Sequence, residues 1–202
     1  MSSAFTQASA LFPNVKGPDG FIQTLPFLDV CRQVLPVVDK LGTAFALVKT
    51  DIGGNIERLA QRAAKDPERY RRLFTIVQDE VVEKTHTEST SCTKGLLWLK
   101  RAMEFICALL RRIHDDAATP LSTEVDETYR ATLMQFHGFF VSNAFWLAFK
   151  FVPSRDEFLT SVGGSGPEVM GEMLGFVDGF GAILEEVHKW MVEQGLNDPT
   201  KV

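Results

Sequence analysis

Aromatic side chains that carry a polar group are scarce in this chain. Its 202 residues include 2 tyrosines and 3 tryptophans against 16 phenylalanines. A phenylalanine ring offers only hydrocarbon, so we expect most of the aromatic surface to face an apolar interior. Hydrophobic residues make up 45% of the chain, which is enough to bury a core and excludes a mainly disordered protein.

Positive charge is also in short supply. The 21 lysines and arginines face 26 aspartates and glutamates, a formal net charge of −5, and no long basic block is present. Binding to a phosphate backbone needs clustered positive charge, so we expect no nucleic-acid partner. The three cysteines, Cys31, Cys92 and Cys107, form no C-x-x-C pair. With no signal or lipid-anchor pattern at the amino terminus, they indicate free thiols and a cytoplasmic location.

Catalytic motifs are missing from the sequence as well. We find no Walker phosphate loop, no H-E-x-x-H, no G-x-S-x-G and no dinucleotide fingerprint. The four histidines lie too far apart for a zinc-binding helical pair. The glycine-rich stretch 163–166 follows no strand pattern, so we interpret it as a connector and not as a phosphate cradle. We therefore expect no enzyme activity, no metal and no cofactor.

One uncharged stretch, residues 131–149, approaches the length of a membrane span. Its polar residues gather on one side of a helix at about 100° per residue, and Leu133 and Phe140 lie on the other. This pattern predicts one buried amphipathic helix over 131–149, and a transmembrane span is the less favoured alternative.

Helical periodicity continues from residue 21 to the carboxyl terminus, without a convincing alternating pattern for a strand. Residues 1–20 contain two prolines and two glycines, so we expect an irregular arm there and a single domain over 21–202. About eight helices packed around a single axis would leave some of their apolar faces uncovered. We therefore predict an all-α fold in which two layers of helices share one core.

Three features could bind a polar ligand. Asp51, Asn55 and Arg58 are spaced four and three apart, so they lie along one stripe of a helix. The stripe is either a solvated helix face or a carboxylate, an amide and a cation that read hydroxyl groups. Trp98, at the edge of an apolar stripe, is either a core-boundary residue or a plate for a sugar ring. His137, on an apolar arc, is either a core histidine or a partner for a ligand amide.

These features occur in a set of runs that resembles the glycolipid transfer protein family, including its fungal heterokaryon-incompatibility members. The runs are VKTDIGGNIERL at 48–59, GLLWLKRAMEFI at 95–106, the dipeptide His137-Gly138 and VPSRDEFL at 152–159. Their order and spacing match over about residues 21–202.

The resemblance implies a two-layer all-α carrier that moves one glycosphingolipid between membranes without a cofactor. It implies that Asp51, Asn55 and Arg58 recognise the sugar, that Trp98 stacks on it, and that His137 and Asp51 hold the ceramide amide. A branch that binds ceramide-1-phosphate has a basic residue at the Asn55 position and Arg at the positions of Trp98 and Ala102. This chain has neither change, so sugar is favoured over phosphate.

Such a carrier must supply an apolar sleeve, because an 18-carbon chain left in water costs about 14 kcal/mol. We expect a tunnel between helices that collapses when it is empty. We also expect the protein to be a monomer that contacts membranes peripherally and transiently. Phe139 stands where animal relatives place a membrane-docking tryptophan. A lipid sensor or signalling adaptor with slow exchange is the alternative function, and a lipid hydrolase is disfavoured because no activated nucleophile is visible. The residues expected to line the tunnel are Val34, Phe105, Leu109, Leu133 and Phe140.

Overall fold

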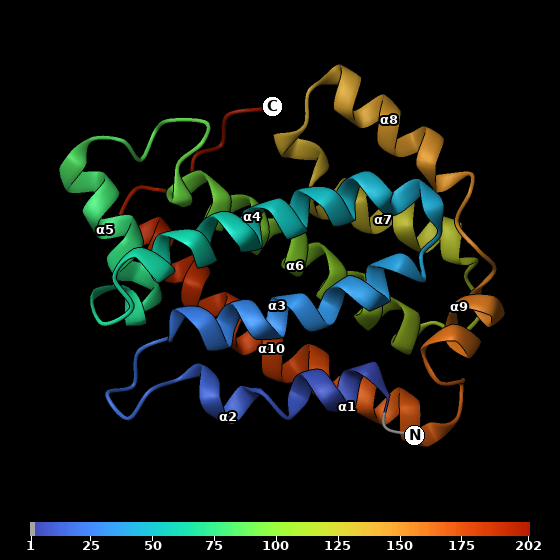
Figure 1. Cartoon of the computed structure of the whole chain (residues 1–202). Coiled ribbons are helices and arrows are strands. Elements are labelled where there is room, and N and C mark those ends of the chain that lie inside the picture. The colour runs from blue at the N-terminus through green and yellow to red at the C-terminus, as the bar shows by residue number, and fades with distance from the viewer. Residues whose placement is uncertain (1–2) are drawn as a thin grey trace.

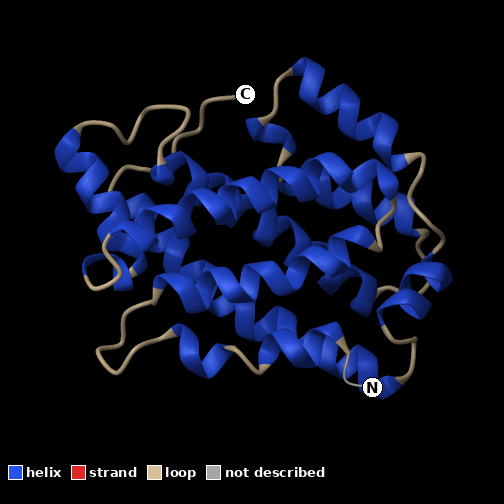
Figure 2. Cartoon of the chain, in the orientation of Figure 1, coloured by secondary structure: helices blue, strands red, loops and turns tan. Residues whose placement is uncertain are grey.

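The computed structural model describes residues 3–202, and all of its regular elements are helices (Figure 2). Eight α-helices have eight residues or more, which confirms the predicted all-α class. In chain order the elements are α1 Ala4–Ser9, α2 Phe12–Val15, α3 Thr24–Asp39, η1 Thr43–Phe45, α4 Ala46–Lys65, η2 Arg69–Arg71, α5 Leu73–Glu83, α6 Cys92–Asp115, α7 Leu121–Thr132, η3 Met134–Phe136, α8 Phe139–Phe149, α9 Arg155–Val162 and α10 Pro167–Glu193.

The helices form two layers around one hydrophobic core. In Figure 1, α3 and α4 pass in front of α6 and α10, and α8 lies at the upper edge of the molecule. Helix α6 packs against α4, α5, α7 and α10, so its side chains form much of the core. Most residues of α6 are buried, including the charged Lys100 and Arg101, as expected for a helix that contacts neighbours on several sides. This central position makes α6 the rigid support for residues that project from it.

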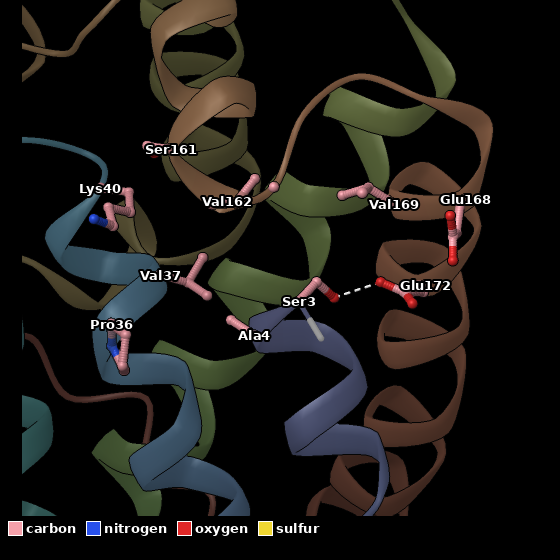
Figure 3. A pocket seen from close by; sticks show the side chains of 11 residues that line it. Ser3, Ala4, Pro36, Val37, Lys40, Ser161, Val162, Glu168, Val169 and Glu172 are labelled. Carbon is pink, nitrogen blue, oxygen red and sulfur yellow. Dashed lines mark hydrogen bonds between the residues drawn. The ribbon is translucent and has the colours of Figure 1, made fainter. Parts of the chain in front are cut away.

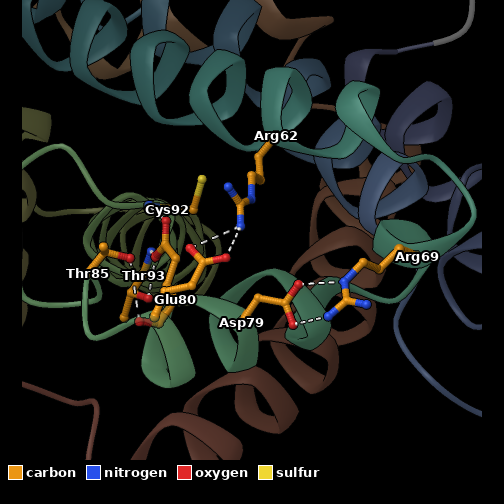
Figure 4. Close-up of polar contacts among 8 residues, drawn as sticks. Arg62, Arg69, Asp79, Glu80, Thr85, Cys92 and Thr93 are labelled. Carbon is orange, nitrogen blue, oxygen red and sulfur yellow. Dashed lines mark hydrogen bonds and ion pairs between the residues drawn. The ribbon is translucent and has the colours of Figure 1, made fainter.

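The start of α6 is fixed by a buried carboxylate on the preceding helix (Figure 4). Glu80 of α5 accepts hydrogen bonds from the backbone amides of Cys92 and Thr93, both at 2.7 Å, and from the Thr93 hydroxyl at 2.6 Å. The first amides of a helix have no partner within it and carry partial positive charge. Glu80 therefore caps α6 from outside, and at the surface Asp79 binds Arg69 in a two-pronged ion pair.

The prediction of an irregular amino-terminal arm over 1–20 was wrong for much of its length, apart from residues 1–2, which lie outside the described part. Helices α1 and α2 occupy 4–15, and Phe5 is buried in the common core. The Phe12 ring lies 5.9 Å from that of Phe176 in α10, and a Cβ added at Gly179 would come within 2.5 Å of it. Contact with α10 therefore orders a segment whose local sequence favours turns.

The single helix predicted over 131–149 was also wrong. Helix α7 ends at Thr132, a short 3-10 turn follows, and α8 begins at Phe139. His137 therefore lies in an extended link between two helices. There the Gly138 amide donates to the Val202 carbonyl (2.6 Å), and a Cβ at Gly138 would meet that oxygen at 3.0 Å. Only glycine allows this close approach without displacement.

The prediction of a connector over 163–166 is confirmed. Just before it, Ser154 and Glu157 form a reciprocal capping box at the start of α9. The connector between α9 and α10 turns at Gly163 and Gly164, whose φ angles of 127° and 114° favour glycine. Along residues 3–202, no helix combines the length and apolarity needed to cross a bilayer.

We expect Glu80→Ala to lower the free energy of unfolding by about 3 kcal/mol, because it leaves buried donors at the start of α6 without an acceptor. Urea unfolding followed by circular dichroism measures the change. Glu83→Ala, on the same helix, is the control: it removes an exposed partner of Arg62 and should cost less than about 1 kcal/mol. Equal losses in the two variants would show that the buried cap contributes no more stability than an exposed ion pair.

Candidate functional site

The polar stripe predicted on one helix face is present on α4. The Asn55 amide nitrogen donates to an Asp51 carboxylate oxygen at 3.2 Å, one turn away. Arg58 donates to the carbonyl oxygens of Ser89 (3.3 Å) and Ser91 (3.0 Å), which join α4 to the loop before α6. The Asp51 carboxylate can therefore accept further hydrogen bonds. Arg58 both holds the loop before α6 and lines the site.

Trp98 and His137 come from different segments and lie together. Trp98 projects from α6, and its ring stacks on that of His137 with centroids 5.5 Å apart and planes inclined by 17°. The Nδ1 atom of His137 is 3.0 Å from the hydroxyl oxygen of Tyr129, a fully buried residue of α7. The His137 ring is thus held by Trp98 on one face and by Tyr129 at Nδ1.

Two adjoining cavities meet at these residues. One has a volume of about 600 Å³ and mainly apolar walls, which include Leu133, His137 and Phe140. The other, of about 290 Å³, is lined by Asn55, Arg58 and other polar residues. Asp51, Trp98 and Val202 belong to the walls of both cavities. The structure therefore places a pocket lined mostly by polar residues beside an apolar cavity, with Asp51 and Trp98 at the boundary between them.

Burial shifts the protonation of the boundary groups. Desolvation raises the pKa of Asp51, while the nearby Arg58 charge and the Asn55 amide act to lower it. Desolvation, with a smaller effect from the Arg101 charge, lowers the pKa of His137 to about 4, so the imidazole is neutral at pH 7. The site thus combines a partly desolvated carboxyl group with a neutral ring that has one N–H and one acceptor nitrogen.

Arg101 lines the polar pocket and connects it to the carboxyl-terminal segment. The side chain is buried, which lowers its pKa to about 10, and it donates to the Asp198 carbonyl at 2.6 Å. Lys94 forms an ion pair with the Asp198 carboxylate. The Val202 amide donates to the Phe136 carbonyl at 3.0 Å. These contacts therefore hold the carboxyl-terminal residues against the boundary between the two cavities.

The residues expected to line a chain tunnel fall into two groups. Leu133 and Phe140 line the apolar cavity. Val34, Phe105 and Leu109 are packed in the hydrophobic core. Phe139, expected at the membrane, is 75% exposed, and its ring meets that of Phe140 at 5.7 Å.

A separate hollow of about 420 Å³ lies between α1, α3, α9 and α10 (Figure 3). Its walls are mixed: Lys40 stands on one side, and Ser3 donates to the Glu172 carboxylate at 2.5 Å on the other. None of the residues predicted to bind a ligand lines it. Within residues 3–202, no group of three histidine, cysteine or carboxylate side chains could hold a metal ion.

Comparison with known proteins assigns the family. The family model for glycolipid transfer protein matches residues 22–164. Glycolipid transfer protein 1 of Arabidopsis thaliana is 39% identical over 97% of this chain and 96% of its own length. The chain belongs to the glycolipid transfer protein family. This confirms the resemblance predicted from the four sequence runs.

Solved structures agree with this family assignment. FAPP2, described as selecting simple glycosphingolipids with the glycolipid-transfer fold, superposes with a TM-score of 0.89 at 28% identity, covering 100% of both chains. The fungal glycolipid transfer protein HET-C2 superposes with a TM-score of 0.79 at 28% identity, covering 89% of this chain and 92% of that one.

Residues that were not predicted from the sequence also line or support the candidate site. Tyr129 and Val202 were not predicted, although Tyr129 is one of only two tyrosines and a buried hydroxyl must find a partner. Arg101, which is buried and lines the polar pocket, was not predicted either. Its position in the pocket depends on the fold of the carboxyl-terminal segment, which has no helical pattern to reveal it.

The lowered pKa of His137 makes stability depend on pH. As the pH falls from 6.5 to 4, the unfolded chain takes up this proton before the folded one does. The free energy of unfolding should therefore fall, by up to about 3 kcal/mol more in the wild type than in His137→Asn. Urea unfolding at a series of pH values measures this difference. Parallel curves for the two proteins would contradict the shifted pKa.

Proposed function

We propose that the protein is a carrier that binds one glycosphingolipid and transfers it between membranes. The observation that supports this most directly is the pair of adjoining cavities, one polar and one apolar, that meet at Asp51 and Trp98. A glycosphingolipid has the same division, with a hydroxyl-rich head joined through an amide to hydrocarbon chains. Family membership supports the same activity, and binding without chemical change needs no catalytic group.

Headgroup recognition is assigned to the polar pocket. Asp51 accepts hydrogen bonds from hydroxyl groups, Asn55 both donates and accepts, and Arg58 donates. Trp98 offers an indole face on which the C–H groups of a sugar ring can pack. A ligand that lacks one of these partners leaves a buried polar group unpaired, so the pocket selects the headgroup.

Hydrocarbon binding is assigned to the apolar cavity and its continuation into the core. A volume of about 600 Å³ is within the usual range of ligand cavities, which is roughly 300–1,000 Å³. We propose that Leu133 and Phe140 contact the first part of the chains. Longer chains would then separate the helices at Val34, Phe105 and Leu109, which pack together in the empty protein.

Membrane contact is assigned to α8 and its surroundings. Phe139 and Phe140 are 75% and 86% exposed, Leu147 lies two turns after Phe140, and Phe151 follows the helix. Exposed apolar groups gathered at one edge are typical of a surface that contacts protein or lipid. We propose that this edge enters the membrane interface transiently, next to the cavity that Phe140 lines.

Asp51→Val and Trp98→Ala should each reduce transfer of glucosylceramide between vesicles by about tenfold or more, because each removes a contact at the boundary of the cavities. A fluorescent donor–acceptor vesicle assay measures the rate. Glu57→Gln is the matched control on α4, since within residues 3–202 this exposed side chain bonds only Gln61 on the same helix. Normal transfer by both site variants would refute the site.

The same assay separates the carrier from a sensor. A carrier exchanges lipid between vesicles without another protein, whereas a sensor would bind glucosylceramide and release it too slowly to transfer it. Mass spectrometry of the recovered lipid detects any hydrolysis.

Replacing both exposed phenylalanines, Phe139→Ser with Phe140→Ser, should lower binding to phosphatidylcholine vesicles by about tenfold or more, because each ring loses its apolar burial. Vesicle co-sedimentation measures the effect. Val82→Ser is the control: this side chain is 82% exposed on α5, away from the proposed docking edge. Equal losses in the two proteins would show that general surface hydrophobicity drives binding.

A further inference from the structure

The two nitrogens of His137 have different surroundings. The ring is 8% exposed and lines the apolar cavity. Nδ1 is 3.0 Å from the Tyr129 hydroxyl oxygen. Within residues 3–202, Nε2 has no hydrogen-bond partner, so it is the nitrogen available to a molecule in the cavity. Whether Nε2 offers a proton or a lone pair decides which ligand group the ring can recognise.

Tyr129 is held firmly enough to control this choice. Its side chain is fully buried, and its ring stacks on Phe145 with centroids 4.8 Å apart and an angle of 15°. The Phe149 ring meets it edge-on at 5.4 Å. The hydroxyl group can donate to Ser142 Oγ at 3.2 Å, and it lies closer to His137 Nδ1. These two atoms are the only protein partners of the hydroxyl among the described residues.

The Tyr129 hydroxyl proton can go either to Nδ1 of His137 or to Oγ of Ser142. A phenol has a single proton to donate, and an imidazole nitrogen is a stronger base than an aliphatic hydroxyl oxygen. The shorter distance also favours Nδ1. When Tyr129 donates to Nδ1, that nitrogen must lack a proton, and the neutral ring carries its proton on Nε2.

We propose that Tyr129 is a positioning residue that donates to Nδ1 of His137 and thereby fixes the Nε2–H tautomer, which presents a hydrogen-bond donor to the lipid carbonyl. The inference rests on the proposed carrier function. Asp51 and His137 line the same cavity, one as an acceptor and the other as a donor. An amide has an N–H and a carbonyl that match this pair, whereas an ester has no N–H.

Tyr129→Phe tests the proposal because it removes one oxygen and keeps the ring that packs on Phe145 and Phe149. Transfer of glucosylceramide should fall by about tenfold. An ester carbonyl is a weaker hydrogen-bond acceptor than an amide carbonyl and has no N–H for Asp51, so an ester lipid depends less on this pair. Transfer of a glucosyl diacylglycerol, whose chains are ester-linked, should therefore change by less than about threefold, and the preference for the amide lipid falls. Ser142→Ala is the matched control: it removes the competing acceptor and should change both rates by less than about twofold.

Nitrogen-15 NMR of histidine-labelled, lipid-free protein gives a readout that does not depend on transfer. The wild type and Ser142→Ala should show His137 with its proton on Nε2 and a hydrogen-bonded Nδ1. Tyr129→Phe should lose the Nδ1 hydrogen-bond shift. The resonances are assigned by their absence from His137→Asn.

Two results would overturn the inference. One is a proton on Nδ1 in the wild type, which would mean that Tyr129 donates to Ser142 and His137 offers a lone pair. The other is an equal loss of transfer for amide and ester lipids in Tyr129→Phe, which would mean a purely structural role. If the wild type transfers neither lipid, the carrier function fails, while the NMR result still decides whether Tyr129 fixes the tautomer.

Discussion

Polar groups placed at the wall of an apolar cavity are the constraint on which this structure depends. His137 is buried, whereas Asp51 is open to water in the empty protein although its surroundings raise its pKa by desolvation. A ligand that fills the cavities covers both groups, and a covered polar group without a hydrogen-bond partner costs about 1–3 kcal/mol, so each must then be satisfied by the protein or by the ligand. Within the protein, Asn55 forms one hydrogen bond with Asp51, and Tyr129 lies within hydrogen-bond distance of His137. The other hydrogen-bonding atoms of Asp51 and His137 remain available to a ligand in the cavities.

This arrangement requires a rigid support, and α6 provides it. The helix contacts both layers, carries Trp98 and Arg101, and begins at a cap supplied by the buried Glu80. Farther along the same helix, buried Lys100 bonds both oxygens of Glu104 and Nδ1 of His188 on α10, at 2.9 Å each. Buried charges with all their partners present hold helices in one register, since an alternative packing would leave the charges unpaired.

Sequence patterns predicted the parts of the molecule in which local spacing is sufficient. The stripe of Asp51, Asn55 and Arg58 follows from helical geometry, and the capping box of α9 follows from Ser154 and Glu157. The family resemblance brought Trp98 and His137 to the same site before the structure placed their rings 5.5 Å apart. Their relation could not come from spacing alone, because they lie on separate segments.

Sequence reasoning failed where contacts distant in the chain determine the local structure. At the helix break before α8, the backbone of Phe136 and Gly138 bonds Val202, which is distant in the sequence. The helices within residues 4–15 depend on the packing of Phe5 and Phe12 against α10. In both places the local sequence is ambiguous, and tertiary packing overrides its propensity.

The exposed side chains of α8 connect the two halves of the proposed function. A protein in water gains nothing from exposing Phe139 and Phe140, and large exposed apolar groups favour aggregation. Phe140 is also a wall of the apolar cavity, so the surface proposed to enter a membrane and the entrance for hydrocarbon share a side chain. A lipid chain that leaves a bilayer beside this residue can pass from membrane to cavity with little exposure to water. That continuity matters because each exposed CH₂ group costs about 0.8 kcal/mol.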